Sequence, residues 1–148
     1  MSLTLDIQSQ RWRAERGLQA RLKKAVAAAL AAAKADPSAD LTLLLTTDKR
    51  VQTLNHNFRG LDKPTNVLSF PAETTGYLGD VAIAYGVTAK EAKEAGKTLS
   101  DHTIHLAVHG VLHLLGYDHV TPKKAAVMEP MEVRILKTLK IADPYESQ

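Results

Sequence analysis

The segment that most constrains the fold of this chain runs from residue 100 to residue 119, where histidines recur within an apolar stretch. Its apolar periodicity predicts a helix over residues 100–115 that packs in the core. His109 and His113 are four residues apart, so such a helix carries both imidazoles on one face, about one turn from each other. We therefore expect a core helix that aims two imidazoles at one point.

A third histidine follows the predicted helix. Gly116 permits a left-handed turn that ends the helix. The chain can then fold back and bring His119 to the point that His109 and His113 face. Three neutral nitrogen ligands leave one of the four tetrahedral positions of Zn²⁺ free for water, which is the pattern of catalytic rather than structural zinc sites. Zinc lowers the pKa of such a water from about 15.7 towards roughly 7. The segment thus predicts one zinc ion per chain, held by these three histidines, and a hydrolytic reaction.

The other histidines have simpler interpretations. His105 lies one turn before His109, and His102 lies before that; we expect both to be structural or to support the ligands. His56 belongs to a different predicted helix and is expected to be exposed. The alternative for the whole group is that the imidazoles only fill space on a buried helix. Their helix-then-turn spacing, with glycine at the break, favours a metal site.

The spacing H-x-x-x-H-x-x-G-x-x-H matches the metzincin zinc peptidases except at one position. Residue 110 is glycine, where those peptidases have the glutamate that activates water and passes a proton to the leaving amine. Asp118, beside the last histidine, could replace this base, although a carboxylate next to a metal ligand is as often a group that orients the ligand. A hydrolase of peptides or small molecules is therefore disfavoured but stays open.

The rest of the chain alternates short and long apolar patterns. Strands are predicted over residues 3–7, 41–45, 67–71 and 80–84, and further helices over residues 12–34, 48–60, 88–95 and 122–139. The helix over residues 48–60 is expected to carry Val51, Leu54 and Phe58 on its apolar face. The predicted architecture is a single α/β (α+β) domain over residues 1–148. It has a small mixed sheet of about four strands packed with about five helices, one of them a metzincin-like zinc helix.

The amino-acid composition indicates a globular protein and its location in the cell. Hydrophobic residues make up 45% and charged residues 24% of the 148 residues, which are globular proportions. The absence of cysteine excludes disulfides, thiolate ligands and a cysteine nucleophile, and makes a reducing cytoplasm the simplest location. No apolar run reaches the roughly 20 residues that a bilayer requires, and the first residues do not read as a secretory signal. We therefore expect a cytoplasmic protein without a membrane partner.

Three segments in a fixed order are highly specific to one family. They are LNHNFRGLDKPTNVLSFP at residues 54–71, LGDVAIA at 78–84 and HGVLHLLGYDH at 109–119. This set resembles the YbeY family, the bacterial zinc-dependent endoribonucleases of rRNA maturation. The resemblance covers most of the chain after Leu41. It implies a single-strand-specific endoribonuclease that acts on the 3′ end of the small-subunit rRNA and on defective ribosomes. Its partners would be single-stranded RNA, the small ribosomal subunit and its assembly factors, with no DNA expected.

The resemblance also implies roles for individual side chains. It implies that the three histidines hold the zinc and that Arg59 lines the cleft and is important for activity. A guanidinium fixed beside a Lewis acid stabilises charge on phosphoryl oxygens without a carboxylate base, so Gly110 is compatible with this reaction. Without the resemblance, we would interpret Arg59 as an exposed cation at the end of a helix. Lys63, near the same loop, is a further candidate for phosphate contact.

Two positions in the same segments are not assigned to catalysis. Residue 66 is Asn66, where many members of the family have aspartate, and an amide cannot accept a proton in its place. Asp80 opens a predicted strand after a glycine, and we expect a structural role for it. Neither is included among the candidate catalytic residues.

One other class of function remains open besides the hydrolases. A non-catalytic ribosome-assembly factor would use zinc only to fix the loop after Gly116 and would hold rRNA in a basic cleft. The net charge of +3 mildly favours a polyanionic partner for either class. Aromatic residues are only 5% of the chain, which argues against extensive base stacking. For the nuclease, the sequence does not choose between zinc-bound water and a substrate 2′-hydroxyl as the nucleophile.

Overall fold

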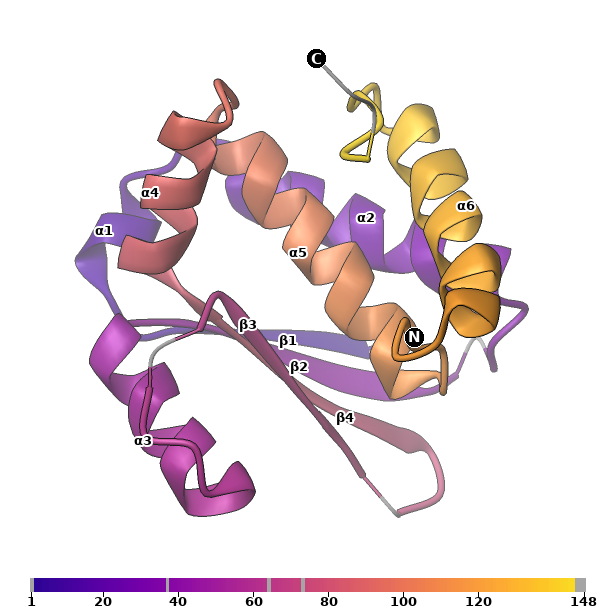
Figure 1. Cartoon of the computed structure of the whole chain (residues 1–148), viewed down its shortest axis with the longest axis horizontal. Helices are drawn as coiled ribbons and strands as arrows, with labels where there is room; N and C mark the ends of the chain where they lie inside the picture. The colour runs from indigo at the N-terminus through magenta and orange to yellow at the C-terminus, as the bar shows by residue number, and fades with distance from the viewer. Residues whose placement is uncertain (1, 37, 64, 73, 146–148) are drawn as a thin grey trace.

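In the computed structural model, which describes residues 2–36, 38–63, 65–72 and 74–145, a four-stranded sheet carries helices on both of its faces (Figure 1). The strands are β1 (Ser2–Ile7), β2 (Asp40–Thr46), β3 (Val67–Pro71) and β4 (Tyr77–Ala84). The helices are α1 (Gln10–Arg13), α2 (Leu18–Ala32), α3 (Asp48–Arg59), α4 (Tyr85–Glu94), α5 (Leu99–Leu114) and α6 (Pro122–Thr138). This confirms the predicted α/β class. No helix among the described residues has the length and apolar character needed to cross a membrane.

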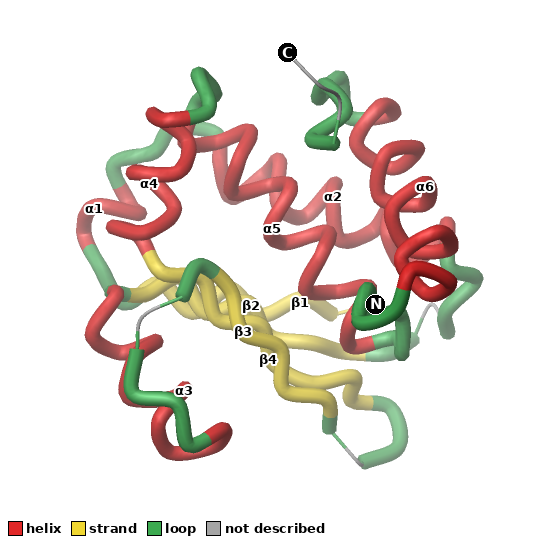
Figure 2. Tube along the Cα trace, in the orientation of Figure 1, coloured by secondary structure: helices red, strands yellow, loops and turns green. Residues whose placement is uncertain are grey.

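The sheet is mixed, with the strand order β1-β2-β4-β3. Strands β1, β2 and β4 run parallel, whereas β3 pairs antiparallel with β4 at the edge of the sheet. Figure 2 shows α2, α4, α5 and α6 on one side of the sheet and α3 on the other. The edge strand β3 therefore borders both helical layers, and its side chains alternate between them.

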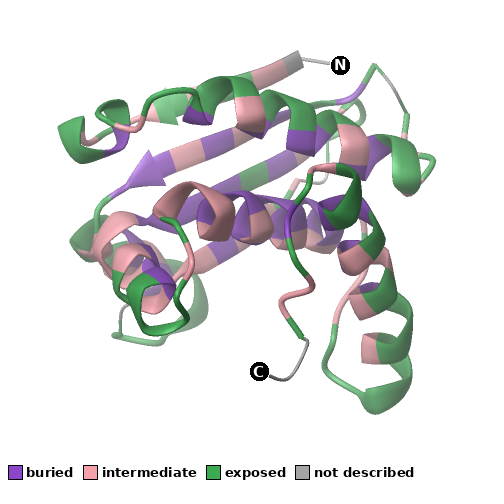
Figure 3. Cartoon of the chain, turned by 90° about the horizontal axis from the view of Figure 1, so that it is seen from above, coloured by how far each residue is buried: buried purple, intermediate pink, exposed green. Residues whose placement is uncertain are grey.

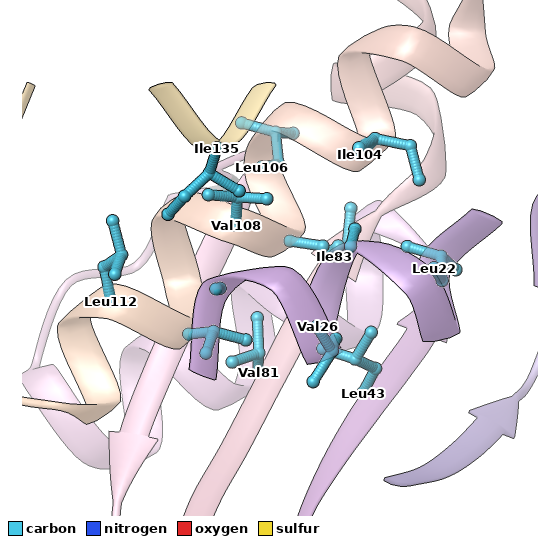
Figure 4. Packing of buried hydrophobic residues seen from close by; sticks show 14 of the residues in the cluster. Leu22, Val26, Leu43, Val81, Ile83, Ile104, Leu106, Val108, Leu112 and Ile135 are labelled. Carbon is cyan, nitrogen blue, oxygen red and sulfur yellow. The ribbon is translucent and has the colours of Figure 1, made fainter. Parts of the chain in front are cut away.

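The main core lies between the sheet and the helices α2, α5 and α6. On β2, Leu41, Leu43 and Leu45 point to this side and are fully buried, and Val81 and Ile83 of β4 join them. Figure 4 shows Leu43, Val81 and Ile83 packed against apolar side chains of α2 and α5. In Figure 3 the buried residues follow α5 and the sheet, while exposed residues cover the outer side of α6. Helix α5 is therefore the core helix that the apolar pattern predicts.

The prediction of one continuous helix over residues 12–34 is wrong. Gly17 adopts a positive φ of 75° and separates the short helix α1 from α2. The break turns Trp12 into the core, where its indole N–H donates to the Thr46 carbonyl oxygen at 2.9 Å. The apolar residues at four-residue spacing, Leu18, Leu22, Val26 and Leu30, all belong to α2.

The apolar face of α3 is also shorter than predicted. Thr47 caps this helix by accepting from the Arg50 N–H, and Val51 is fully buried. Phe58, however, has 68% of its surface exposed, so the expectation that it joins the apolar face is wrong. The last turn of α3 leads away from the core of the sheet, and there Phe58 packs beside the ring of Phe70.

Candidate functional site

The local structure around the three histidines follows from caps and glycine. Thr98 begins α5, because its hydroxyl accepts from the Asp101 N–H at 3.0 Å. After α5 the chain turns at Gly116, whose φ of 97° is readily adopted only by glycine. The short loop that follows carries His119 and ends at Thr121, which caps α6. This is the predicted sequence of helix, glycine turn and returning loop.

The three histidines come together as predicted. Nε2 of His109 lies 3.0 Å from Nε2 of His113. The ring centroid of His119 lies 5.1 Å from that of His109 and 5.4 Å from that of His113. One ring nitrogen of each histidine falls within 4.8 Å of the other two. Zinc–nitrogen distances of about 2.0–2.1 Å place two ligands of a tetrahedral zinc about 3.3 Å apart. Donor chemistry and spacing therefore fit a three-histidine zinc site.

The site also contains a carboxylate that the histidine spacing does not predict, Glu132 of α6. Its side chain is fully buried, and its Oε1 accepts from Nδ1 of His109 at 2.8 Å. Its Oε2 accepts from Nε2 of His105 at 3.1 Å and from the hydroxyl of Tyr145 at 2.8 Å. A carboxylate only accepts, so Nδ1 of His109 carries the ring proton and Nε2 is left with a free lone pair facing His113. Glu132 thus fixes the tautomer that a metal ligand needs.

The protonation states of this group agree with its geometry. Burial raises the pKa of the Glu132 carboxyl, but hydrogen bonds from His105 and His109 outweigh it and lower the pKa to about 2. Burial is also the largest cause that lowers the pKa of His113 to about 4, followed by the nearby charges of His109 and His119. Burial, and then the charge of Glu132, raise the pKa of Tyr145. At pH 7 the carboxylate is therefore ionised, His113 is neutral and the tyrosine keeps its proton.

The two histidines earlier on α5 contact carboxylates and do not join the three-histidine group. His105, His109 and Glu132 also lie close enough to hold a metal ion. Their contacts are explained by hydrogen bonds, since each imidazole donates to one oxygen of Glu132. His102 lies 2.9 Å from Oε1 of Glu91, and the Asn66 amide donates to the same oxygen at 3.0 Å. Asn66 therefore links the start of β3 to α4 and α5.

The histidines open into a cleft of about 640 Å³, here called the histidine cleft. It is lined by Arg59, Asn66, Val67, Ser69, Pro71, His105, Leu106, His109, His113, Asp118, His119, Val120 and Tyr145. Arg59, the last residue of α3, donates from Nη2 to the Ser69 carbonyl oxygen at 3.1 Å. The Ser69 hydroxyl in turn donates to the Gly110 carbonyl oxygen at 3.1 Å. These contacts connect α3, β3 and α5 and bring the guanidinium to the cleft of the three histidines.

Gly110 marks the place where α5 lies directly on the sheet. A Cβ atom at this position would come within 2.6 Å of Cγ1 of Val81 and 3.2 Å of the Ser69 hydroxyl. Position 110 therefore faces β4 and β3 instead of the histidine cleft. A glutamate here would be directed into packed side chains, so the general base of the metzincin peptidases has no room at this position.

Asp118 lines the histidine cleft and orders the loop that carries His119. Its Oδ1 accepts from the Val120 N–H at 3.0 Å, and its Oδ2 lies 3.4 Å from Nζ of Lys124. The Val120 hydrogen bond is the largest cause that lowers the pKa of this half-buried carboxyl. Of its two expected alternatives, these contacts favour the role of a supporting group over that of a base.

Lys63 and Asp80 lie apart from the histidines. The Lys63 side chain is exposed and does not line the histidine cleft, while its carbonyl oxygen accepts from the Asn55 amide at 3.0 Å. Its contact with phosphate stays a prediction. Asp80 points to the α3 side of the sheet and accepts from the Tyr77 hydroxyl, which agrees with the structural role expected for it. His56 is exposed on α3, as predicted.

The sequence does contain a signal for Glu132. The buried residues of α6 are Met128, Glu132, Ile135 and Leu136, a spacing that forms one apolar face. A carboxylate in the middle of such a face needs a buried partner, because an unpaired buried charge is costly. The histidines of α5 were available as donors, so the pair could have been proposed from the two helices together.

Comparison with known proteins identifies the family. The family model described as Endoribonuclease YbeY matches residues 5–140. A protein from Rhodopseudomonas palustris named Endoribonuclease YbeY is 48% identical over 147 residues, which cover 93% of this chain and 86% of the relative. A protein of the same name from Nitrobacter winogradskyi is 50% identical over 145 residues, covering 90% of this chain and 76% of that protein.

A solved structure supports the fold. The solution structure of a protein from Thermotoga maritima matches with a TM-score of 0.62 and 21% sequence identity, over 98% of this chain and 99% of the other. This likeness concerns the fold, whereas the family model and the two relatives span the residues that form the site. The chain belongs to the Endoribonuclease YbeY family.

Proposed function

We propose that this protein is a zinc-dependent endoribonuclease that cleaves single-stranded RNA in the cytoplasm. Endoribonuclease activity and an RNA substrate are those of its family. Within that activity we propose the 3′ end of the small-subunit rRNA and defective ribosomes as targets, with the small subunit and its assembly factors as partners. The observation that carries the proposal is the meeting of three imidazoles and one guanidinium in a single cleft. The family names do not favour a non-catalytic assembly factor or a peptidase.

His109, His113 and His119 would hold the metal. Zinc bound there would supply Lewis-acid chemistry, polarising a phosphoryl oxygen and lowering the pKa of water. Glu132 acts as a positioning residue, because it holds the proton of His109 on Nδ1 and keeps Nε2 free for the ion. Such a carboxylate–histidine contact also increases the basicity of the ligand nitrogen.

Arg59 is the residue that we assign to the phosphate. Cleavage of a phosphodiester increases the negative charge on the phosphoryl oxygens, and a planar guanidinium stabilises this charge with two parallel hydrogen bonds. The bond to Ser69 uses one part of the guanidinium and fixes its position, while its remaining N–H groups can reach a phosphate. This arrangement explains how the reaction proceeds with glycine at position 110.

Cleavage of a single-stranded RNA oligomer by zinc-loaded, nuclease-free protein tests the proposal, with a DNA oligomer of the same sequence as a control substrate. His113→Ala should lose both zinc and cleavage. Arg59→Glu should keep zinc and the fold but lose cleavage. His56→Ala and Arg16→Glu are matched controls, because both side chains are exposed and lie outside the histidine cleft.

The pattern of results separates the classes of function. If His113→Ala and Arg59→Glu cut RNA as well as the parent, the activity is a contaminant and the assembly factor becomes the better explanation. The product ends then identify the nucleophile. A 2′,3′-cyclic phosphate indicates attack by the substrate 2′-hydroxyl, whereas its absence from the earliest products indicates attack by water.

A further inference from the structure

A second cleft, of about 610 Å³, lies on the α3 side of the sheet. Phe58 and Phe70, the two phenylalanines of the chain, form one wall, with ring centroids 5.4 Å apart and an angle of 59° between the rings. Leu44, Leu54 and Ala82 also line this cleft, which we call the phenylalanine cleft. Phe58 has 68% of its surface exposed and lines this cleft, so its ring is accessible to a ligand.

Apart from Arg59 at its border with the histidine cleft, the polar groups of the phenylalanine cleft are unsuited to phosphate. Asp6 and Asp80 bring carboxylates, and Thr42 brings a hydroxyl that bonds to the Tyr77 hydroxyl at 2.8 Å. Carboxylates repel a phosphate but accept hydrogen bonds from amino groups and ring N–H groups. An apolar wall with acceptors at its side suits a flat, uncharged group that carries N–H donors. Nucleobases have this chemistry.

The phenylalanine cleft adjoins the histidine cleft. Arg59, Ser69 and Pro71 line both of them. The edge strand β3 separates the two clefts, and Arg59 reaches its Ser69 carbonyl group from the side of α3. A strand of RNA whose phosphate contacts Arg59 therefore has the histidines on one side and the two phenylalanine rings on the other.

We propose that the phenylalanine cleft binds a nucleobase next to the scissile phosphate and stacks it on Phe58; this inference rests on the proposed function. A nucleobase is the expected occupant, because Arg59 lines both clefts and the carboxylates of Asp6 and Asp80 can accept hydrogen bonds beside the rings. Stacking on an aromatic side chain tolerates any base, which suits a nuclease that selects single strands over sequence. Few aromatic residues are needed, because the two phenylalanines of the chain meet at this one point.

The test measures KM and kcat for cleavage of a single-stranded RNA oligomer by the zinc-loaded protein. Phe58→Leu keeps an apolar side chain but removes the ring, and should raise KM about tenfold with kcat and zinc content unchanged. Phe58→Tyr keeps the ring and should behave like the parent. Leu61→Ala is the matched control, because Leu61 is 48% exposed nearby but lines neither cleft.

A second set of substrates locates the base. Replacing one nucleotide at a time by an abasic ribose should weaken cleavage by the parent strongly at one position beside the cleaved bond. At that position Phe58→Leu should cleave the abasic substrate almost as well as it cleaves the intact oligomer, since both changes remove the same stacking contact. Additive losses at every position would overturn the proposal, as would a KM of Phe58→Leu equal to that of the parent.

The outcomes also distinguish this inference from the proposed function. If the parent does not cleave RNA, fluorescence anisotropy with the same oligomers measures binding, and Phe58→Leu must weaken it about tenfold for the cleft to be a base site. If Phe58→Leu leaves both binding and cleavage unchanged but alters the sedimentation of the protein, the cleft is a protein interface and the base site is wrong.

Discussion

The two faces of the sheet differ in how completely they are covered. On the α5 side, helices pack over the sheet, and the buried carboxylate of Glu132 has three donors. On the α3 side a single helix covers part of the sheet, and beside it remain a cleft and an exposed phenylalanine. The covered face can hold imidazoles in a fixed geometry because neighbouring groups form hydrogen bonds with them. The open face has surface left for a ligand.

Substitutions on the two faces should therefore change different properties of the protein. Substitutions on the covered face should change the free energy of unfolding or the affinity for zinc, because they disturb packed or hydrogen-bonded groups. Substitutions at exposed positions on the open face should leave the fold unchanged and act on substrate binding.

Two adjacent leucines on β2 provide the largest expected contrast. Leu43 is fully buried on the covered face, whereas Leu44 is half-buried and lines the phenylalanine cleft. Leu43→Ala should lower the free energy of unfolding by about 2–5 kcal/mol, because it leaves a cavity in a packed core. Leu44→Ala should cost less than about 2 kcal/mol. Urea unfolding of both variants measures the difference, and equal losses would contradict the contrast between the faces.

Glu132→Gln tests the carboxylate behind the histidines. An amide can accept from one imidazole but donates where Glu132 accepts from the others, so it no longer fixes His109 as the carboxylate does. We expect zinc affinity to fall about 10–100-fold. Competition with a chelating dye measures it. Glu129→Gln removes the same charge one turn earlier on α6 and should keep the affinity of the parent; equal affinities for both variants would exclude a positioning role for Glu132.

Gly110→Ala tests the contact between α5 and the sheet. The added methyl would meet the packed side chain of Val81, so the helix or the strand must shift, at a cost of about 1–3 kcal/mol. Gly86→Ala is the comparison, because there the atoms nearest to the new methyl belong to the end of the Asp48 side chain, which can rotate at the cost of its hydrogen bond from the Val87 N–H. Thermal unfolding should therefore show a lower midpoint for Gly110→Ala than for Gly86→Ala. The reverse order would mean that α5 does not rest on the sheet at this residue.

Phe58→Ala should have the smallest effect on stability. The side chain is largely exposed, so the free energy of unfolding should stay within about 0.5 kcal/mol of the parent. Phe70→Ala removes the more buried ring of the same pair and should cost more. Urea unfolding checks both. A large loss in Phe58→Ala would show that this ring is structural, and would remove the distinction between the two faces at this point.

Helix α5 could be predicted closely because local signals and apolar periodicity agree there. The expected helix over residues 100–115 differs by one residue at each end from α5. Thr98 and Gly116 supply the end signals, and His109 and His113 need only helical geometry to meet. Arg59 could be assigned only through the family resemblance, because its hydrogen bond to β3 depends on tertiary structure.

The errors arise where tertiary contacts decide the result. Alanine is frequent throughout residues 12–34, which favours one long helix. The indole of Trp12, however, donates to a carbonyl oxygen 34 residues away, and the helix is interrupted at Gly17. Phe58 has helical spacing from Leu54, but periodicity does not say how far the sheet extends beneath a helix. Glu132 meets His109 across 23 residues, and this contact requires knowing that α5 and α6 pack together.

The position of Glu132 late in the chain also affects the stage of translation at which the site can be complete. Every zinc-ligand candidate has been translated once His119 is added, but the carboxylate that orients His109 and the tyrosine that bonds to it come later in the chain. A nascent polypeptide that stops before α6 therefore carries all three imidazoles without their support. Under the proposed function such a fragment would bind zinc weakly, so an interrupted translation product would pose little danger to the RNA of the ribosome that made it.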